Sequence, residues 1–318
     1  MLPPAIRSLR QKLTRWYDQA KRDLPWRKTR DPYAIWISEV MLQQTRVAAV
    51  IPYYERFLKR FPTPTSLAIA PESDLLTMWA GLGYYSRARN LQKAAQQIAA
   101  AGTFPNNYES ILALSGIGPY TAAAIASISF GLPHAVVDGN VKRVLARWTN
   151  DANVDAQPLA DSLLDPRDPA RWNQAMMELG ATVCLPRHPH CAECPVARHC
   201  EAHQAGTQNE LPLKRAKPIP EQLERTLLVI RRKRSILLTP SPLVKGFWDL
   251  PEHVPQSRLG STLGDFRHTI THRRYRFTVK EATTLTTPVE SRWHTINELA
   301  KIPLSTTAKK ALRIYNAI

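Results

Sequence analysis

Four cysteines in the second half of the chain have the spacing of a metal-binding array. Cys184, Cys191, Cys194 and Cys200 form the pattern C-x6-C-x2-C-x5-C. The N-terminal residues lack the apolar stretch of a secretory signal, so the chain is expected in a reducing compartment, where disulfides are rare. Four thiolates suit either a structural zinc ion or a [4Fe–4S] cluster. Zinc ribbons usually carry two separated C-x2-C pairs and this chain has one, which favours the cluster.

A second chemical signal is a carboxylate within an apolar run. Glu39 lies in Ile35-Trp-Ile-Ser-Glu-Val-Met-Leu42, where burial would destabilise its ionised form and raise its pKa. A raised pKa suits a general acid at neutral pH. The alternative is an ordinary glutamate on the solvated face of an amphipathic helix. Gln43 lies one turn further along the same face.

A glycine-rich turn precedes another carboxylate. Gly116 and Gly118 lie in Leu114-Ser-Gly-Ile-Gly-Pro-Tyr-Thr-Ala122. Two glycines at this spacing permit a tight turn whose N–H groups can approach a phosphate, and the helix that begins near Pro119 directs its positive end there. An ordinary corner between two helices is the alternative. Asp138 follows after a short interval, and by itself it could be a helix N-cap.

The elements that must position these residues are mainly helical. Residues 1 to about 203 show helical spacing and proline stops, and Asp31-Pro32 predicts the start of a helix that runs to Thr45 and extends towards Arg60. Residues 204–222 are polar and proline-rich, as in a linker. Short β-type runs follow at 225–230, 235–238 and 274–279, with a closing helix after Ser305.

The charge of the chain indicates a polyanionic partner. The chain has 318 residues, 43 Lys and Arg against 26 Asp and Glu, and a formal net charge of +17. Residues 223–318 carry 17 basic and 7 acidic residues, a net charge of +10. Nucleic acid is the expected partner of such a field. No apolar run is long enough for a membrane span.

Taken together, these motifs resemble the endonuclease III superfamily of DNA glycosylases. The cysteine array and the hairpin followed by Asp138 match that superfamily. The segments Trp36 to Arg46, Gly81-Leu-Gly-Tyr-Tyr-Ser-Arg87 and Asn173-Gln-Ala-Met-Met-Glu-Leu-Gly180 are very similar to MutY-type adenine glycosylases. The resemblance covers residues 7–203 in register.

This resemblance implies a multi-domain fold. An all-α helix–hairpin–helix glycosylase region with an iron–sulfur cluster loop would occupy residues 1–203. Its helical barrel would span about 30–137, and its cluster domain about 1–29 with 138–203. A linker at 204–222 and a small α+β, Nudix-like domain at 223–318 would follow. The four cysteines would ligate the [4Fe–4S] cluster.

The resemblance also assigns site residues. Glu39 would protonate adenine at N7, and Asp138 would stabilise the oxocarbenium-like sugar, with carboxyls about 5–5.5 Å apart if the reaction passes through a covalent intermediate. Asn140 and Tyr120 would support these carboxylates. The adenine pocket would include Trp26, Arg27 and Glu178, and Gln43 and Tyr84 would wedge into the DNA stack, because a base in a duplex must be extruded.

Tyr120 separates two reactions within the superfamily. Bifunctional relatives have a lysine two positions after the second hairpin glycine, and that amine attacks the sugar. A phenol cannot form a Schiff base. The expected activity is therefore that of a monofunctional adenine glycosylase. The alternatives are a bifunctional endonuclease III-like glycosylase of pyrimidine lesions and a non-catalytic iron–sulfur DNA-binding protein.

The C-terminal part resembles the lesion-recognition domain of the same family. Residues 245–252, Lys-Gly-Phe-Trp-Asp-Leu-Pro-Glu, resemble a Nudix segment, but no two acidic residues of the region are adjacent, which argues against metal-dependent hydrolysis. The family commonly has Phe-Ser-His where this chain has Ile270, Thr271 and His272. Thr271 and His272 would contact 8-oxoguanine, and loss of the aromatic ring at Ile270 would weaken that recognition.

The expected function is base-excision repair. A monomeric, cytoplasmic, nucleoid-associated enzyme would remove adenine opposite 8-oxoguanine or guanine from double-stranded DNA. This reaction prevents G·C to T·A transversions.

Overall fold

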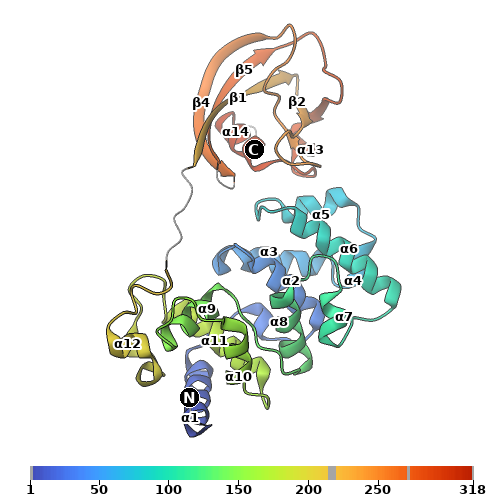
Figure 1. Ribbon diagram of the computed structural model, residues 1–318. Coiled ribbons are helices and arrows are strands. Elements are labelled where there is room, and N and C mark those ends of the chain that lie inside the picture. The colour runs from blue at the N-terminus through green and yellow to red at the C-terminus, as the bar shows by residue number, and fades with distance from the viewer. Residues whose placement is uncertain (1–2, 214–219, 271–272, 317–318) are drawn as a thin grey trace. The chain divides into compact units, whose positions relative to one another are not determined.

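The computed structural model describes residues 3–213, 220–270 and 273–316 and divides the chain into two compact units. The first unit comprises Met1–Ala68 with Asn90–Arg215, and the second comprises Ile69–Arg89 with Ala216–Ile318 (Figure 1). Thr271 and His272, the predicted 8-oxoguanine contacts, lie outside the described residues. The predicted order of a helical region followed by an α+β region is confirmed.

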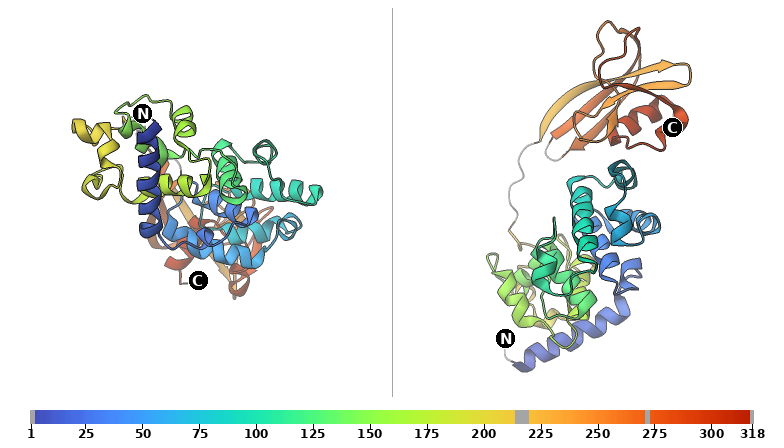
Figure 2. Two further views of the ribbon diagram at one scale, coloured as in Figure 1. Left: turned by 90° about the horizontal axis from the view of Figure 1, so that it is seen from below. Right: turned by 90° about the vertical axis from the view of Figure 1, so that its right-hand side faces the viewer.

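The first unit is built from helices. They are α1 (Pro3–Ala20), α2 (Pro32–Leu42), α3 (Val47–Arg60), α4 (Pro64–Ala68), α6 (Ser86–Ala101, which begins in the second unit), α7 (Tyr108–Leu112), α8 (Pro119–Phe130), α9 (Gly139–Trp148), α10 (Ala156–Leu163), α11 (Pro169–Thr182) and α12 (Glu201–Ala205), with 3-10 turns at Pro25–Arg27, Cys191–Glu193 and Ala197–His199. Helix α2 packs against α8, and α11 packs against both α1 and α9. Figures 1 and 2 show α1, in dark blue, at the N-terminal end of this unit.

Helix α2 is enclosed on all sides. Every residue from Tyr33 to Met41 is buried, which excludes the alternative of an amphipathic helix with Glu39 on a solvated face. The Asp31 carboxylate accepts hydrogen bonds from the N–H groups of Tyr33 and Ala34, as expected for an N-cap before Pro32.

The expected extension of this helix to Arg60 is wrong. Helix α2 ends at Leu42, and α3 begins at Val47. Between them Gln44 adopts a left-handed backbone conformation with φ of 56°, which interrupts the helical hydrogen-bond ladder. The break turns the polar residues that follow α2 towards the cavity described below.

The second unit combines one helical segment with a mixed sheet. Residues 69–89 contain α5 (Glu72–Trp79). The sheet contains β1 (Glu221–Arg232), β2 (Ser235–Pro240), β3 (Trp248–Asp249), β4 (Arg258–Ile270), β5 (Arg273–Thr283) and β6 (Arg292–Thr295), followed by α13 (Ile296–Leu299) and α14 (Thr306–Ile314). The order is β3-β2-β1-β5-β4, with β6 paired to β2; β1 and β5 are parallel and the other pairs antiparallel.

Helix α14 covers one face of this sheet, as Figure 1 and the right view of Figure 2 show. The predicted alternation in β5 is confirmed: Tyr275, Phe277 and Val279 are buried, whereas Arg274 and Arg276 are exposed. The buried side chains join a core with Ala308, Ala311 and Leu312 of α14. No helix among the described residues is long and apolar enough to cross a membrane.

Candidate active site

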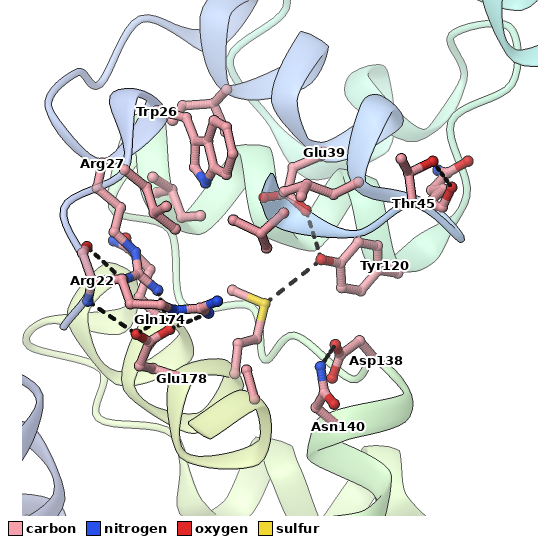
Figure 3. Close-up of a pocket in the computed structure, with 18 of the residues that line it drawn as sticks. Arg22, Trp26, Arg27, Glu39, Thr45, Tyr120, Asp138, Asn140, Gln174 and Glu178 are labelled. Atoms are coloured by element: carbon pink, nitrogen blue, oxygen red, sulfur yellow. Dashed lines mark hydrogen bonds and ion pairs between the residues drawn. The ribbon is translucent and has the colours of Figure 1, made fainter. Parts of the chain in front are cut away.

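One cavity of about 520 Å³ in the first unit brings together most of the predicted site residues. Its walls come from the Pro25–Arg27 turn, the end of α2, the start of α8, the start of α9 and one face of α11 (Figure 3). Eight predicted residues line it: Trp26, Arg27, Glu39, Gln43, Tyr120, Asp138, Asn140 and Glu178.

Glu39 is a buried acid. Its side chain is 5% exposed, and its Oε2 accepts a hydrogen bond of 2.6 Å from the Tyr120 hydroxyl. Burial raises the pKa of Glu39 to about 7; the hydrogen bond from Tyr120 opposes this rise, and the negative charge of Asp138 adds to it. Burial and the charge of Glu39 also raise the pKa of Tyr120, which keeps the phenol a hydrogen-bond donor. At neutral pH the site therefore holds a carboxyl that can give up a proton.

Asp138 faces the same cavity from the start of α9, and Tyr120 lies between it and Glu39 in Figure 3. Its Oδ1 accepts from the Val141 N–H at 2.7 Å, so Asp138 is indeed an N-cap as well as a pocket residue. Its Oδ2 accepts from Nδ2 of Asn140 at 2.9 Å. These two donors hold the Asp138 carboxylate at the N-terminal end of α9.

Arg143 connects the hydrogen-bonded pair of Asp138 and Asn140 to the cysteine loop. Its Nη2 donates to Oδ1 of Asn140 at 2.9 Å and to the carbonyl of Gly180 at 2.7 Å, while its Nε donates to the carbonyl of Cys184 at 2.9 Å. A Cβ on Gly180 would lie 2.6 Å from Cβ of Asn140, so α11 can approach Asn140 this closely only with glycine at that position.

Glu178 is buried like Glu39, but its pKa is lowered where that of Glu39 is raised. It is fully buried, yet it accepts hydrogen bonds from the backbone and guanidinium of Arg22 and from Arg27. Burial alone would raise its pKa, but these bonds outweigh burial and hold the pKa of Glu178 at about 2. Two carboxyl groups of one cavity thus have widely separated pKa values, and of these two only Glu39 can hold a proton near neutral pH.

Arg22 was missed by the sequence analysis. It follows the last residue of α1 by two positions, and no motif marks it. Only the fold brings it to Glu178, 156 residues away. Gln174 and Met177 were also missed. Gln174 lies one turn before Glu178 on the same helix, a spacing that could have indicated it, whereas no spacing rule indicates Met177.

The hairpin glycines lie just before α8. Gly116 has φ of 76°, and a Cβ there would meet the Asn90 side chain at 2.5 Å. Gly118 is the N-cap of α8 and has φ of −98°, with no atom within 4 Å of an added Cβ. The first glycine is therefore required by conformation and packing, whereas the second leaves the helix start open to solvent or to a ligand.

These two glycines give a matched pair of substitutions. We expect Gly116→Ala to lower the free energy of unfolding by about 1–3 kcal/mol, because alanine is strained at positive φ and overlaps Asn90. Gly118→Ala should cost less than about 1 kcal/mol. Urea denaturation followed by tryptophan fluorescence measures both. Equal destabilisation by the two changes would contradict this account.

The four cysteines line a separate small cavity. No group of three or more His, Cys, Asp or Glu side chains among the described residues is placed to hold a single metal ion. The guanidinium of Arg147 is buried beside them: Nη1 donates to Sγ of Cys184 at 3.1 Å, and no partner for Nη2 is found in the described part of the chain. Burial raises the pKa of Cys194 to about 12. Four thiols around one small cavity beside a buried cation form a donor set that could hold an anionic metal centre.

The remaining predicted residue, Tyr84, belongs to the second unit. It is 48% exposed and has φ of 48°, in a turn with Gly81 and Gly83, which also have positive φ.

Known proteins are similar to this chain in sequence. A family model described as "HhH-GPD superfamily base excision DNA repair protein" matches residues 37–164. The adenine DNA glycosylase of Rattus norvegicus is 34% identical, over 98% of this chain and 78% of its own length. That of Buchnera aphidicola subsp. Baizongia pistaciae is 35% identical, over 82% of each chain.

Two solved structures have the helical fold. A thermostable thymine-DNA glycosylase is 29% identical with a TM-score of 0.59, over 64% of this chain and 98% of that chain. A trapped endonuclease III–DNA covalent intermediate is 24% identical with a TM-score of 0.56, over 65% of this chain and 99% of that chain, and this supports the fold alone. The chain is a member of the adenine DNA glycosylase family, within the helix–hairpin–helix superfamily of base-excision repair proteins.

Proposed function

We propose that this chain excises adenine mispaired with 8-oxoguanine or guanine in double-stranded DNA. The observation that carries the proposal is the buried Glu39, whose pKa is about 7, in one cavity with Asp138. Departure of a purine leaves a cationic sugar, so the reaction needs an acid at the base and an anion at the sugar. The family membership supplies adenine as the base. Excision of this adenine prevents G·C to T·A transversions.

The leaving base is activated by Glu39. Tyr120 occupies Oε2, which leaves Oε1 to carry the proton towards N7 of an extruded adenine. Glu178 cannot compete for this role, because its two arginine partners keep it ionised. We assign Trp26, Arg27 and Glu178 to the wall that holds the adenine ring.

The sugar is stabilised by Asp138. Asn140 and the Val141 N–H hold its carboxylate in place, so little reorganisation is needed as positive charge develops. A direct covalent route would require the two carboxyls about 5–5.5 Å apart, and this separation stays a prediction.

The proposed chemistry is monofunctional. Tyr120 replaces the lysine of bifunctional relatives, and none of the described residues that line the cavity is a lysine. Without an amine no Schiff base can form with the sugar. Strand cleavage would therefore need alkali after the base has left.

The excision rate should depend on pH through Glu39. Because its pKa is about 7, the protonated fraction falls roughly tenfold per unit at higher pH. Single-turnover rates between pH 6 and 9, at enzyme concentrations below saturation, should show an alkaline limb near pH 7. Binding of a duplex with a non-hydrolysable adenine analogue, measured over the same range, separates affinity from chemistry. A flat rate profile would contradict the role of Glu39.

We further propose that Cys184, Cys191, Cys194 and Cys200 hold a [4Fe–4S] cluster. Such a cluster would supply a rigid anionic centre that anchors the loop between α11 and α12, and would accept the hydrogen bond of Arg147. Its part is structural, and no step of base excision passes through it.

The metal content is a direct prediction. The purified protein should contain about four irons per chain and absorb visible light, whereas a zinc site would give about one zinc and no colour. Cys200→Ser should abolish the absorbance and lower the midpoint of thermal unfolding, because Cys200 lies buried in the helical core. Full metal content and unchanged stability in this variant would remove Cys200 from the ligand set.

The sheet of the second unit is proposed as a Nudix-like reader of the opposite strand. Thr271 and His272 would contact 8-oxoguanine, next to Ile270 at the end of β4. We propose further that the domains follow the predicted bounds (1–203, 204–222 and 223–318) and that the enzyme acts as a monomer at the nucleoid.

The proposal is tested by a cleavage assay on DNA duplexes that differ only in the base opposite the target adenine. An adenine-containing strand annealed opposite 8-oxoguanine, guanine, cytosine or thymine is incubated with the full chain and then treated with alkali. Cleavage at adenine opposite 8-oxoguanine and guanine, and not opposite thymine, is expected. Cleavage before alkali, or a covalent adduct trapped by borohydride, would indicate a lyase and overturn the monofunctional assignment.

A further inference from the structure

Within the second unit, a loop of the sheet is fastened to the helical segment that carries Tyr84. The loop runs from β2 to β3 and contains Lys245, Gly246 and Phe247. Phe247 is 1% exposed and packs with Leu76 and Ala80 in one apolar cluster. The Phe247 side chain is therefore buried against α5 and the turn that follows α5, and not in the core of the sheet.

Phe247 meets the turn through Tyr85. The two ring centroids are 4.2 Å apart with planes tilted by 46°, so the two rings are in direct contact. Tyr85 directly follows Tyr84, so displacement of the Tyr85 ring would move the backbone of the predicted wedge.

A hydrogen bond from Arg89 to the backbone of Lys245 also holds this loop. Nη2 of Arg89 donates to the carbonyl of Lys245 at 2.6 Å, while its Nε pairs with Glu72 at 2.7 Å. Gly246 has φ of 83°, and a Cβ there would lie 2.9 Å from both Arg89 and Leu76. A side chain at this position would be strained by the positive φ and would displace the ends of the Arg89 and Leu76 side chains.

The loop and the turn are each held rigidly. On the sheet side, buried Asp249 accepts from the hydroxyls of Ser241, Ser305 and Thr307. On the turn side, Arg87 donates to the carbonyls of Leu82 and Gly83, and its guanidinium lies 5.4 Å from the centre of the Tyr84 ring. Hydrogen bonds thus tie both the loop that carries Phe247 and the turn that carries Tyr84 to their own surroundings.

We propose that Phe247 is a positioning residue for base extrusion: through Tyr85 it holds the strained turn that presents Tyr84 to the DNA stack. The inference rests on the proposed wedge role of Tyr84. It gives the Lys245–Phe247 loop of the sheet a part in extrusion beyond recognition of the opposite base. Exposed Tyr84, with φ of 48°, needs such support because a left-handed tyrosine is costly in isolation.

A double-mutant cycle tests the coupling. Full-length chains with Tyr84→Ala, Phe247→Ala and both changes are compared in a Glu39→Gln background, in which base excision is expected to be slow. A 2-aminopurine next to the target adenine reports unstacking by its fluorescence. Tyr84→Ala should lower the extruded fraction at least about fivefold, the typical size of one base–aromatic stack. Phe247→Ala should lower it severalfold, and the double variant should be no worse than Tyr84→Ala alone.

Three further variants keep the test decisive if Phe247→Ala folds poorly. Phe247→Leu should restore extrusion, because it refills the apolar site. Arg89→Ala should lower extrusion through loss of the Lys245 bond, whereas Glu72→Gln, which leaves that bond in place, should not. The same variants without the Glu39 change should show matching losses in single-turnover excision.

The outcomes separate this inference from the proposed function. Multiplicative losses in the double variant, or wild-type extrusion in both Phe247→Ala and Arg89→Ala, would overturn the positioning role and leave the excision chemistry intact. Wild-type extrusion in Tyr84→Ala would overturn the wedge assignment and this inference together. Loss of excision in the duplex assay with normal extrusion would instead count against the proposed chemistry.

Discussion

Glu39→Gln is expected to lower the single-turnover rate of adenine excision by about 10²–10⁴-fold, the usual contribution of a general acid. Glutamine has nearly the same shape and can still accept the hydrogen bond from Tyr120, so the cavity should persist. It cannot deliver a proton to the leaving purine. Rates on an 8-oxoguanine·adenine duplex measure the effect. The matched control is Glu55→Gln, the same change at an exposed position of α3.

The same substitution should increase stability at high pH. Burial raises the pKa of Glu39 to about 7, against 4.5 for an ordinary glutamate. Its stability contribution is complete below pH 4.5 and is lost as pH rises through 7, because the folded state must then hold a buried charge. Glu39→Gln lacks this loss, so its advantage over the wild type should grow between pH 4.5 and 7, to about 3 kcal/mol, and then level off. Urea denaturation at pH 5 and pH 8 measures the difference.

An active, unstabilised Glu39→Gln enzyme would contradict both expectations. It would show that the buried carboxyl neither supplies the proton nor carries the desolvation cost that its surroundings imply. The alternative assignment, with Glu178 as the acid, is already disfavoured because two arginines keep Glu178 ionised.

Asp138→Asn is the second large effect, and we expect about a 10²–10³-fold lower excision rate. Asparagine is a good N-cap and can keep the hydrogen bond from the Val141 N–H, so stability should change by less than about 1 kcal/mol. What is lost is the negative charge beside the developing cationic sugar. A large rate loss with an unchanged unfolding curve would therefore separate the electrostatic role of Asp138 from its capping role.

Binding of a charged sugar mimic gives an independent measure. A duplex with a cationic pyrrolidine in place of the target nucleotide imitates the transition state and should bind the wild type more tightly than Asp138→Asn. A neutral tetrahydrofuran at the same position should bind both equally. If the variant discriminates between the two duplexes as the wild type does, the charge of Asp138 does not stabilise the sugar.

Much of the local structure was determined by the sequence alone, because its causes are local. Asp31 followed by proline predicted the start of α2, and the alternation in residues 274–279 predicted the two faces of β5. The apolar neighbours of Glu39 predicted its burial and raised pKa. Short-range sterics, capping and hydrophobic periodicity act within a few residues and can be interpreted directly.

The pairing of distant charges was decided only by the tertiary structure. No pattern placed Arg22 beside Glu178, linked Arg143 to both Asn140 and Cys184, or buried Phe247 against Tyr85. The break at Gln44 was also missed, since a left-handed residue other than glycine leaves no clear trace in the sequence. These contacts join segments far apart along the chain. Their geometry depends on how whole helices and strands pack, and a linear pattern carries that information only weakly.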